Sequence, residues 1–290
     1  MSEVGRTEER VMPAGSMGWQ PAAIAEKVAV CGAYLELVAT TPELLEVARR
    51  ALYALALSAG QRVLEVGCGT GVFLPLLAAA VGMEGSVVGI DHSPDFVAQA
   101  RERVAALGIA ETVEVREGDA YRLPFPDGSF DAVHCERVLM HLDDPTAALR
   151  EMHRVLRPGG HVVAVEPDWR AMQIDHPDFE TMRLLMDRFA ETFRNPAMGR
   201  ELCRCFAEAG FVERRIAPVF FGATDIADIA KFGLDFSESE AALVASGHVT
   251  RERAQSALTY LVEASRDGTF FGFGGMFVES AQAQSDCAPL

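Results

Sequence analysis

Hydrophobic and polar positions change their rhythm repeatedly along the middle of this chain. Short apolar runs, the first at residues 62–67 (RVLEVG) and the last at 161–168 (HVVAVEPD), have the length and composition of strands. Between them lie longer segments such as SPDFVAQARERVAALG at 93–108, which begins with a capping serine and ends at a glycine, as helices do. Strand and helix alternate five times, at spacings of about 20 to 30 residues. This pattern predicts βαβ units and a parallel sheet with helices on both faces.

The chain on either side of this region has a different pattern. The first residues are polar and show no period, whereas TPELLEVARRAL begins a helix with Thr41 as N-cap and Pro42 at the first position. After the fifth strand the regular alternation ends, and helical segments rich in Met and Phe follow. We therefore divide the chain into a flexible arm (1–18), N-terminal helices (19–58), a core (59–167), the rest of the core with inserted helical segments (168–280) and a tail (281–290).

Composition narrows the classes of protein to which the chain can belong. It has 290 residues, 49% of them hydrophobic, which suits a large buried core and not a disordered chain. The formal net charge of -16 repels nucleic acid and anionic lipid. We expect a small-molecule substrate, no nucleic-acid partner and no membrane insertion, and a homodimer is left open. The charged N-terminus has no secretory signal and the apolar runs are too short to span a bilayer, so we expect a cytoplasmic protein.

The stretch VLEVGCGTG at residues 63–71 carries the clearest chemical signal. Its three glycines, Gly67, Gly69 and Gly71, follow the first strand, at the edge where parallel sheets bind ligands. Glycine permits a close approach of ligand to backbone, and the next helix presents its N-terminus there. A dinucleotide loop has the spacing G-x-G-x-x-G, but here the third glycine comes one residue early. The spacing argues against NAD and favours a ligand without a pyrophosphate.

Together with three later segments, this stretch resembles the motif set of the class I S-adenosylmethionine (SAM) methyltransferases. VLEVGCGTG resembles motif I, VVGIDHSP the second strand, GDAYRLPFPDGSFDAV the third-strand exit, and ALREMHRVLRPGGHVVAVEP the helix and fifth strand of the small-molecule branch. The resemblance covers roughly residues 60–167 and is nearest to ubiquinone and menaquinone C-methyltransferases and natural-product O- and C-methyltransferases. It implies an α/β, Rossmann-like, doubly wound sheet of seven mostly parallel strands with an antiparallel last strand, N-terminal helices and a helical lid or insertion. It also implies SAM as cofactor and S-adenosylhomocysteine (SAH) as product.

Two acidic residues are expected to bind the nucleoside part of this cofactor. The resemblance implies that Asp91 binds the ribose hydroxyls and Asp119 the adenine amine. Asp91 stands 20 residues beyond Gly71, and a carboxylate can accept both hydroxyl hydrogens of a diol. The alternatives are a helix-capping Asp91, although Ser93 already serves as a cap, and a solvated turn residue at Asp119. The full set of expected cofactor residues is Glu65, Gly67, Gly69, Gly71, Asp91, His92, Asp119, Ala120 and His134.

Glu65 is an acidic residue in the otherwise apolar first strand. If it is buried there, its carboxylate needs hydrogen-bonding or charged partners. We expect it either to accept hydrogen bonds from loop amides or to lie near the cationic methionine end of SAM. A bridge to an Arg or Lys is the alternative. For His134, which lies nearer the interior of the fourth strand, a structural or cofactor-lining role is favoured.

Methyl transfer requires that the acceptor be aligned with the methyl group of SAM. Where the acceptor must lose a proton, it also requires a base. In the resembled branch a histidine at the position of His141 and an acid after the fifth strand sometimes act in proton removal, so His141 is the first catalytic candidate and Glu166 the second. The alternatives are a capping or solvated His141 and a salt bridge from Glu166 to Arg137. The DHPD run at 175–178 is too weak a set for a metal, and no metal is expected.

The acceptor site is expected in the segments that the core does not supply. These are rich in Met and aromatic residues, as pockets for small ligands are, and we expect Tyr34, Trp169 and Phe193 to bind the acceptor. The alternative is that the inserted segments need these residues for their own core. The N-terminal helices are expected to close over SAM as a lid.

The sequence thus predicts a SAM-dependent methyltransferase acting on oxygen or carbon of a small, largely apolar or aromatic acceptor, such as a quinol, polyketide or terpenoid. The fourth-strand exit HCERVL lacks the Asn/Asp-Pro-Pro-Tyr run common in enzymes that methylate nucleobase amines. One alternative is a SAM-binding protein that regulates, or that uses SAM in a cyclisation. An NAD-dependent oxidoreductase is a further alternative, disfavoured by the glycine spacing.

Overall fold

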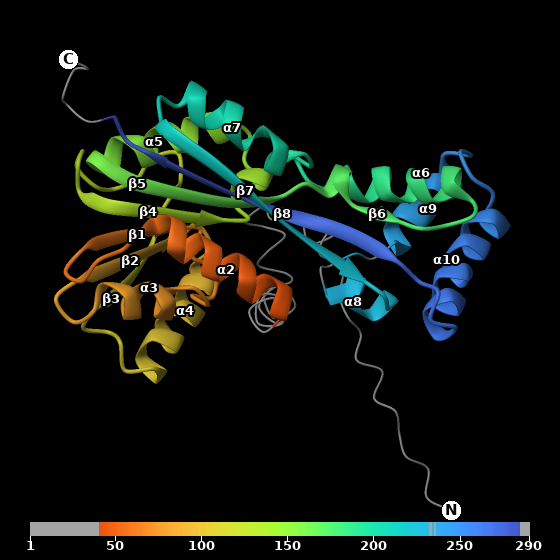
Figure 1. The fold of residues 1–290 in the computed structure, drawn as a ribbon, viewed down its shortest axis with the longest axis horizontal. Helices are drawn as coiled ribbons and strands as arrows, with labels where there is room; N and C mark the ends of the chain where they lie inside the picture. Colours follow the sequence, from red (N-terminus) through yellow and green to blue (C-terminus); the bar gives the residue numbers. More distant parts are fainter. Residues whose placement is uncertain (1–40, 232–233, 235, 285–290) are drawn as a thin grey trace, which may run out of the picture.

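The computed structural model describes residues 41–231, 234 and 236–284, which form a mixed sheet with helices on both faces (Figure 1). The strands are β1 (Arg62–Val66), β2 (Ser86–Asp91), β3 (Val113–Glu117), β4 (Phe130–Glu136), β5 (Leu156–Pro167), β6 (Gln173–Ile174), β7 (Val212–Ala223) and β8 (Gly272–Gln282). The helices are α2 (Pro42–Leu55), α3 (Leu74–Val81), α4 (Pro94–Ala106), α5 (Pro145–Val155), α6 (Phe179–Ala190), α7 (Met198–Glu208), α8 (Ile226–Lys231), α9 (Ser237–Ala245) and α10 (Arg251–Arg266). Two short 3₁₀ turns, η2 (Leu139–His141) and η3 (Trp169–Ala171), follow β4 and β5.

The order of the strands confirms the predicted doubly wound architecture. It runs β3-β2-β1-β4-β5-β8-β6, with β7 paired to the free side of β8. Strands β1 to β5 are parallel, and β8 is antiparallel to β5. The sheet has eight strands where seven were expected, because the two-residue β6 pairs with the end of β8 that extends past β5. The winding reverses between β1 and β4, which is where such sheets bind ligands.

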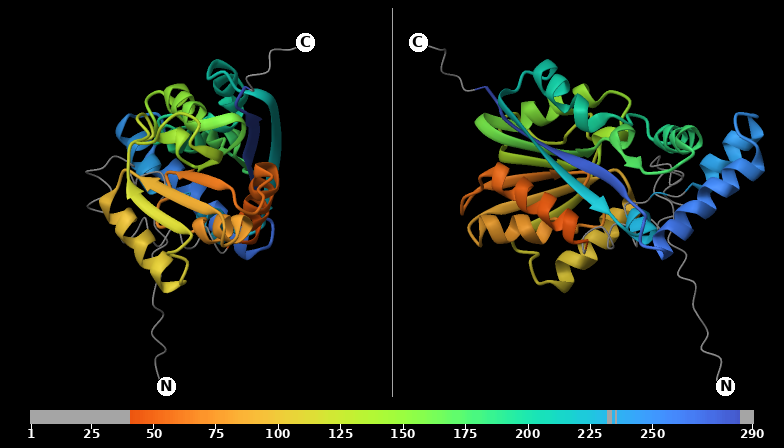
Figure 2. Two further views of the ribbon diagram at one scale, coloured as in Figure 1. Left: turned by 90° about the vertical axis from the view of Figure 1, so that its left-hand side faces the viewer. Right: turned by 45° about the vertical axis from the view of Figure 1, so that its right-hand side comes forward.

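Two layers of helices cover this sheet. Helices α2, α3 and α4 lie on one face, and α5 and α7 lie on the other (Figures 1 and 2). The strands between them are apolar because both of their faces are covered; in β1, Val63, Leu64 and Val66 have no exposed surface. Helix α5 begins where the Asp144 side chain accepts a hydrogen bond from Ala147 N, and Ser93 caps α4 in the same way at Phe96 N. These caps fix where each helix leaves the ligand edge of the sheet.

A helical extension adjoins one end of the sheet. Helices α6, α9 and α10 and strand β6 gather there, on the right of Figure 1, and β7 and β8 run from the core toward them. Strand β8 serves both regions: residues 276–282 pair with β5, while Gly272 and Phe273 pair with β6. The extension is therefore joined to the core through the backbone of one long strand.

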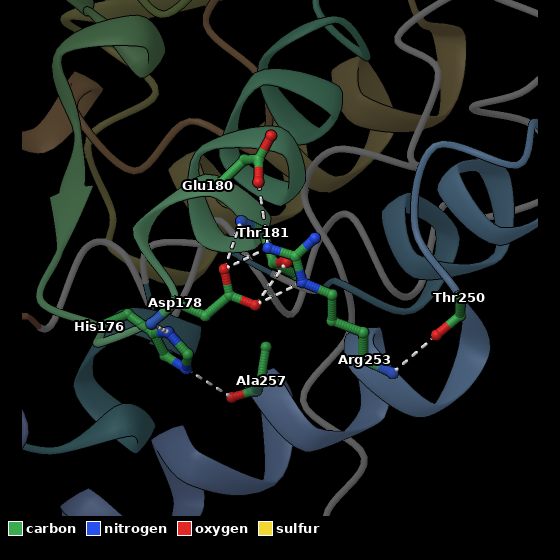
Figure 3. Close-up of polar contacts among 7 residues, drawn as sticks. All are labelled: His176, Asp178, Glu180, Thr181, Thr250, Arg253 and Ala257. Atoms are coloured by element: carbon green, nitrogen blue, oxygen red, sulfur yellow. Dashed lines mark hydrogen bonds and ion pairs between the residues drawn. The ribbon is translucent and has the colours of Figure 1, made fainter.

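A polar cluster fastens α6 to α10 within the extension (Figure 3). The Asp178 carboxylate caps α6 at Thr181 N and also accepts two hydrogen bonds from Arg253, at 2.7 and 2.8 Å. His176 accepts a hydrogen bond from Asp178 N through Nδ1 and contacts the Ala257 carbonyl through Nε2, at 3.2 Å. His176 and Asp178 of the DHPD run thus connect the start of α6 to α10.

Candidate cofactor and acceptor site

A cavity of about 670 Å³ opens at the carboxyl ends of β1, β2 and β4. Its wall combines a polar side, built from the glycine loop and the residues after β2 and β3, with an apolar side from α2, η2 and η3. Of the expected cofactor and acceptor residues it contains Glu65, Gly67, Gly69, Asp91, His92, Asp119, Ala120, His141, Trp169 and Phe193. The structure therefore brings most of the predicted residues into one space.

The glycine loop owes its shape to backbone angles and close approaches that residues with a side chain rarely allow. Gly67 has a φ of +71°, and a Cβ at this position would lie 2.2 Å from Cγ2 of Val138. Gly71 has a φ of +78°, and its Cβ would approach that of Ala100 at 3.1 Å. Gly67 thus lets the loop pack closely against Val138, just after β4, and Gly71 lets it pack against Ala100 of α4. The close packing leaves the loop backbone facing the cavity.

Asp91 ends β2 beside this loop. Its Oδ2 accepts a hydrogen bond from Gly69 N at 2.9 Å, and its Oδ1 accepts one from Ser93 N, also at 2.9 Å. Burial raises the pKa of Asp91, while these backbone hydrogen bonds act in the opposite direction. Ser93 caps α4, so Asp91 is not needed for that purpose. Each carboxylate oxygen retains acceptor capacity, which suits a diol. His92 is exposed on the cavity wall, with Nδ1 3.4 Å from Asp91 Oδ1.

Asp119 and Ala120 line the cavity after β3. The exposed Asp119 side chain accepts a hydrogen bond from Tyr121 N through Oδ1, at 2.8 Å. This is the turn-stabilising contact that the alternative interpretation expects. The contact uses one oxygen and fixes the other beside the cavity, so the turn and a ligand contact are compatible.

Glu65 has a partner that the sequence interpretation did not name. Its Oε2 lies 2.7 Å from Nδ1 of His134 on the adjacent strand, and among the described residues this histidine, not a loop amide, Arg or Lys, is its partner. Glu65 lines the cavity with 3% of its surface exposed. His134 is fully buried and outside the cavity wall, stacked on Phe73 at 4.2 Å between ring centroids. The expected direct contact of His134 with the cofactor is therefore corrected: the imidazole lies behind Glu65.

His141 ends the 3₁₀ turn η2 on the apolar side of the cavity. Its ring centroid is 6.0 Å from that of Phe193. Burial, together with the charges of Arg137 and His92, lowers the pKa of His141 to about 3. The imidazole is consequently neutral at physiological pH and can accept a hydrogen bond, but it is a weak base in this environment.

Glu166 is not a wall residue, in contrast to its expected catalytic role. It is fully buried at the end of β5, and Oε1 accepts hydrogen bonds from Val138 N at 2.9 Å and Leu139 N at 2.7 Å. Burial raises the pKa of Glu166 to about 8. The alternative salt bridge to Arg137 is also absent among the contacts of the described residues, because Arg137 pairs with Glu136 at 3.1 Å. Glu166 acts as an anchor for the turn that carries His141.

The acceptor side of the cavity is aromatic. Trp169 of η3 stacks on Phe193, with ring centroids 4.8 Å apart and an interplanar angle of 13°. Both rings are about 95% buried and line the cavity. The same rings also pack on Phe189 of α6, so they belong to the core of the extension as well as to the cavity wall. Tyr34, the third expected acceptor residue, lies outside the described residues.

Arg137 lines the cavity, although it was not among the site residues predicted from the sequence. It follows β4 with a φ of +54°, which is rare for a residue with a side chain, and Glu166 holds the next two amides. Its Nε is buried with no hydrogen-bond partner among the described residues. A charged residue directly after a buried strand at the ligand edge was the signal in the sequence.

The described residues contain no group of three or more His, Cys, Asp or Glu side chains arranged to hold a metal ion. No helix within the described ranges is both long and apolar enough to cross a membrane.

The chain is similar in sequence to a known protein family and to individual known proteins. The family described as "Methyltransferase domain" matches residues 64–164. An uncharacterised 37.1 kDa protein of a Streptomyces fradiae transposon is 38% identical over 251 residues, which are 86% of this chain and 70% of that protein. A demethylmenaquinone methyltransferase of Staphylococcus aureus is 35% identical over 188 residues, covering 58% of this chain and 75% of the relative.

Solved structures share the fold at lower identity. A methyltransferase structure from Bacillus halodurans has a TM-score of 0.57 at 20% identity and covers 82% of this chain and 99% of its own. The [4+2]-cyclase SpnF has a TM-score of 0.53 at 23% identity, covering 83% and 81%. Geranyl diphosphate C-methyltransferase from Streptomyces coelicolor has a TM-score of 0.53 at 20% identity, covering 82% and 77%. At such identities the likeness concerns the fold.

Proposed function

Because this chain belongs to the class I SAM-dependent methyltransferases, we propose that it transfers the methyl group of SAM to an oxygen or carbon atom of a small, largely apolar or aromatic acceptor. The observation that carries the proposal is the two-sided cavity. The glycine loop and its acidic neighbours form one side, and the stacked Trp169 and Phe193 form the other. A single space of about 670 Å³ is large enough for a cofactor and a small acceptor together.

The polar side has groups suited to each part of the cofactor. In the proposal Asp91 accepts the ribose hydroxyls, Asp119 and Ala120 flank the adenine, and Glu65 attracts the cationic methionine end. The loop at Gly67 and Gly69, which lines the cavity, completes the site. When bound, SAM supplies a methyl group already activated by its positive sulfur. The protein's main contribution is then to hold the acceptor in line, which can lower a barrier by roughly 7 to 11 kcal/mol.

The apolar side is proposed to orient the acceptor. Trp169 and Phe193 offer a flat surface for a ring or an isoprenoid chain, and they help to exclude water from the reacting atoms. His141 is proposed to accept a hydrogen bond from an acceptor hydroxyl. Its lowered pKa fits this orienting role better than complete removal of a proton in the free enzyme. Arg137 adds one cationic donor to this otherwise apolar wall.

The relatives favour particular acceptors to test first. The Staphylococcus aureus relative is named for a quinone precursor, and one structural neighbour for a prenyl diphosphate. A quinol or prenyl compound is therefore a sound first choice for this chain. The cytoplasmic location and the lack of a nucleic-acid partner remain predictions from the sequence, and a homodimer remains open.

The experiment is an acceptor screen with SAM carrying a labelled methyl group. Phenols, quinols and prenyl diphosphates are incubated with the protein, and label transfer and SAH are measured together. We expect transfer to at least one apolar acceptor, and loss of most of it in Trp169→Ala with SAH affinity retained within about twofold, because Trp169 is on the acceptor side. Tight SAH binding without transfer to any acceptor would count against the proposal.

A second function is favoured by one observation, the structural likeness to a [4+2]-cyclase. In that case the protein would convert an acceptor to an isomer without consuming SAM. The same screen separates the two functions, since a cyclase gives a product of unchanged mass and no SAH.

A further inference from the structure

A buried histidine lies directly behind the cofactor side of the cavity, and the function proposed above does not use it. His134 has no exposed surface, and its Nδ1 is 2.7 Å from Oε2 of Glu65. Nε2 is also buried, and it has no hydrogen-bond partner among the described residues. Phe73, just before α3, covers the ring at 4.2 Å with an interplanar angle of 13°. A polar side chain enclosed in this way needs a reason, because burying it without full hydrogen bonding costs free energy.

We propose that His134 is a positioning residue for the cofactor: as an imidazolium it donates its Nδ1–H to Glu65, and so keeps this carboxylate ionised and turned toward the cationic methionine end of SAM. The inference rests on the proposed function, because it assumes that SAM occupies the cavity.

The geometry of the two strands supports this arrangement. Glu65 of β1 and His134 of β4 are paired residues of parallel neighbours, so their side chains leave the same face of the sheet. Glu65 reaches the cavity and His134 does not. The contact uses Oε2, which leaves Oε1 outside it. The histidine thus fixes the carboxylate from behind without taking space from a ligand.

The electrostatic surroundings of Glu65 and His134 also support this arrangement. Burial raises the pKa of Glu65, so this carboxyl group would tend toward its neutral form if it stood alone. Burial acts to lower the pKa of His134, but the neighbouring Glu65 outweighs it and the pKa is raised. Among the described residues, the other titratable groups whose charges act with that of Glu65 are acids or buried thiols, which supply no positive charge: Glu136 on β4, Asp91 at the end of β2, Cys68 in the glycine loop and Cys135 on β4. His134 is the group that can keep Glu65 ionised.

The test measures SAH binding by calorimetry between about pH 6 and about pH 9 for the wild type and His134→Phe. The wild type should bind with nearly constant affinity. His134→Phe keeps a ring on Phe73 but leaves Glu65 buried without a partner, so Glu65 takes up a proton at the lower pH. Its SAH affinity should fall about tenfold or more there and recover as the pH rises and Glu65 ionises.

Three further variants separate positioning from packing. Val163→Ala removes a buried side chain next to His134 in the sheet register, and should lower the melting temperature without making SAH binding depend on pH. Glu65→Gln should weaken binding at every pH, and adding His134→Phe to it should cause no further loss. His134→Asn keeps a neutral donor toward Glu65; it should show a smaller loss with the same pH dependence, and it carries the test if His134→Phe does not fold.

The outcomes are distinct. An equal, pH-independent loss in His134→Phe and Val163→Ala would overturn the inference and leave His134 with a packing role only. Wild-type-like binding by His134→Asn and His134→Phe at every pH would also overturn it. A wild type that binds no SAH would remove the proposed function, and the inference with it.

Discussion

The two sides of the cavity are built in different ways. The cofactor side is made of backbone: the glycine loop passes under Val138, and Asp91 and Asp119 are themselves held by backbone amides. The acceptor side is made of side chains, Trp169 and Phe193 from segments separated in sequence, supported by the helices of the extension. A backbone site depends on a few positions where only one residue type fits. A side-chain wall can change its shape by many substitutions. The same architecture can therefore hold one cofactor and accept different partners for it.

The largest effect that would test this contrast is expected at the glycine loop. Gly67→Ala places a Cβ 2.2 Å from Val138 and forces a residue with a side chain to a φ of +71°. We expect loss of measurable SAH binding and a lower melting temperature. Gly108→Ala is the matched control, because Gly108 has a φ of +67° and open space around its Cβ position. It should cost only the backbone strain, about 1 to 2 kcal/mol, and leave SAH binding intact.

Comparable binding by the two alanine variants would contradict the view that the close approach to Val138 shapes the cofactor side. Calorimetry and thermal melting on the same samples distinguish loss of the site from loss of the fold.

An intermediate effect is expected at Glu166, which lies behind the cavity and holds the turn from Val138 to His141. Its pKa is about 8 in the fold and 4.5 in the reference state, so between these values the folded chain keeps a proton that the unfolded chain has lost. The free energy of unfolding therefore falls as the pH rises through this window, by about 1.4 kcal/mol for each unit of pKa difference. Glu166→Gln mimics the protonated form, and its free energy of unfolding should decline less between about pH 5 and about pH 8.

Denaturant titrations at several pH values measure this slope. Glu84→Gln, which changes an exposed carboxylate far from the cavity, should leave it as in the wild type. A residual slope is expected in Glu166→Gln because burial also raises the pKa of Asp91 and Glu65 raises the pKa of His134. Parallel curves for the wild type and Glu166→Gln would refute the assignment of a buried, protonated anchor.

The smallest effect is expected in the extension, at the cluster that joins α6 to α10. Arg253→Met removes both hydrogen bonds to Asp178 and the contact with Glu180. Amide hydrogen exchange at the start of α6 and in α10 should become faster, while SAH affinity stays unchanged, since no atom of the cluster lines the cavity. Arg188→Met, which removes an exposed pair with Glu191 on α6, should alter neither quantity. Exchange that increases equally in β1 and β2 would show that the two regions are not separable.

Sequence patterns predicted the cofactor side better than the acceptor side, and the reason is physical. Gly67 and Asp91 act through local backbone requirements that leave a trace in a few adjacent letters. Trp169 and Phe193 could be named only as aromatic candidates, because their stacking depends on the path of the chain between them. His134 and Glu65 lie 69 residues apart, and their pairing follows from the strand register, which no local pattern reports.

The structure differs from the expectation at two residues. Glu166 was a catalytic candidate because the resembled family branch sometimes uses an acid after the fifth strand, but here its carboxylate turns inward to Val138 and Leu139. Arg137 was overlooked although it is a charged residue directly after a buried strand; its positive φ cannot be read from the sequence.

Strand β8, which pairs with strands of both the core and the extension, is synthesised late. A ribosome delivers residues 272–282 after every other described strand and helix. Until then β5 has one unpaired edge, and β6 and β7 have no partner strand among the described residues. The pairs among β1, β2, β3 and β4, which frame the cofactor side, do not depend on β8. The acceptor side, by contrast, can obtain its full frame only after the last described strand has been made.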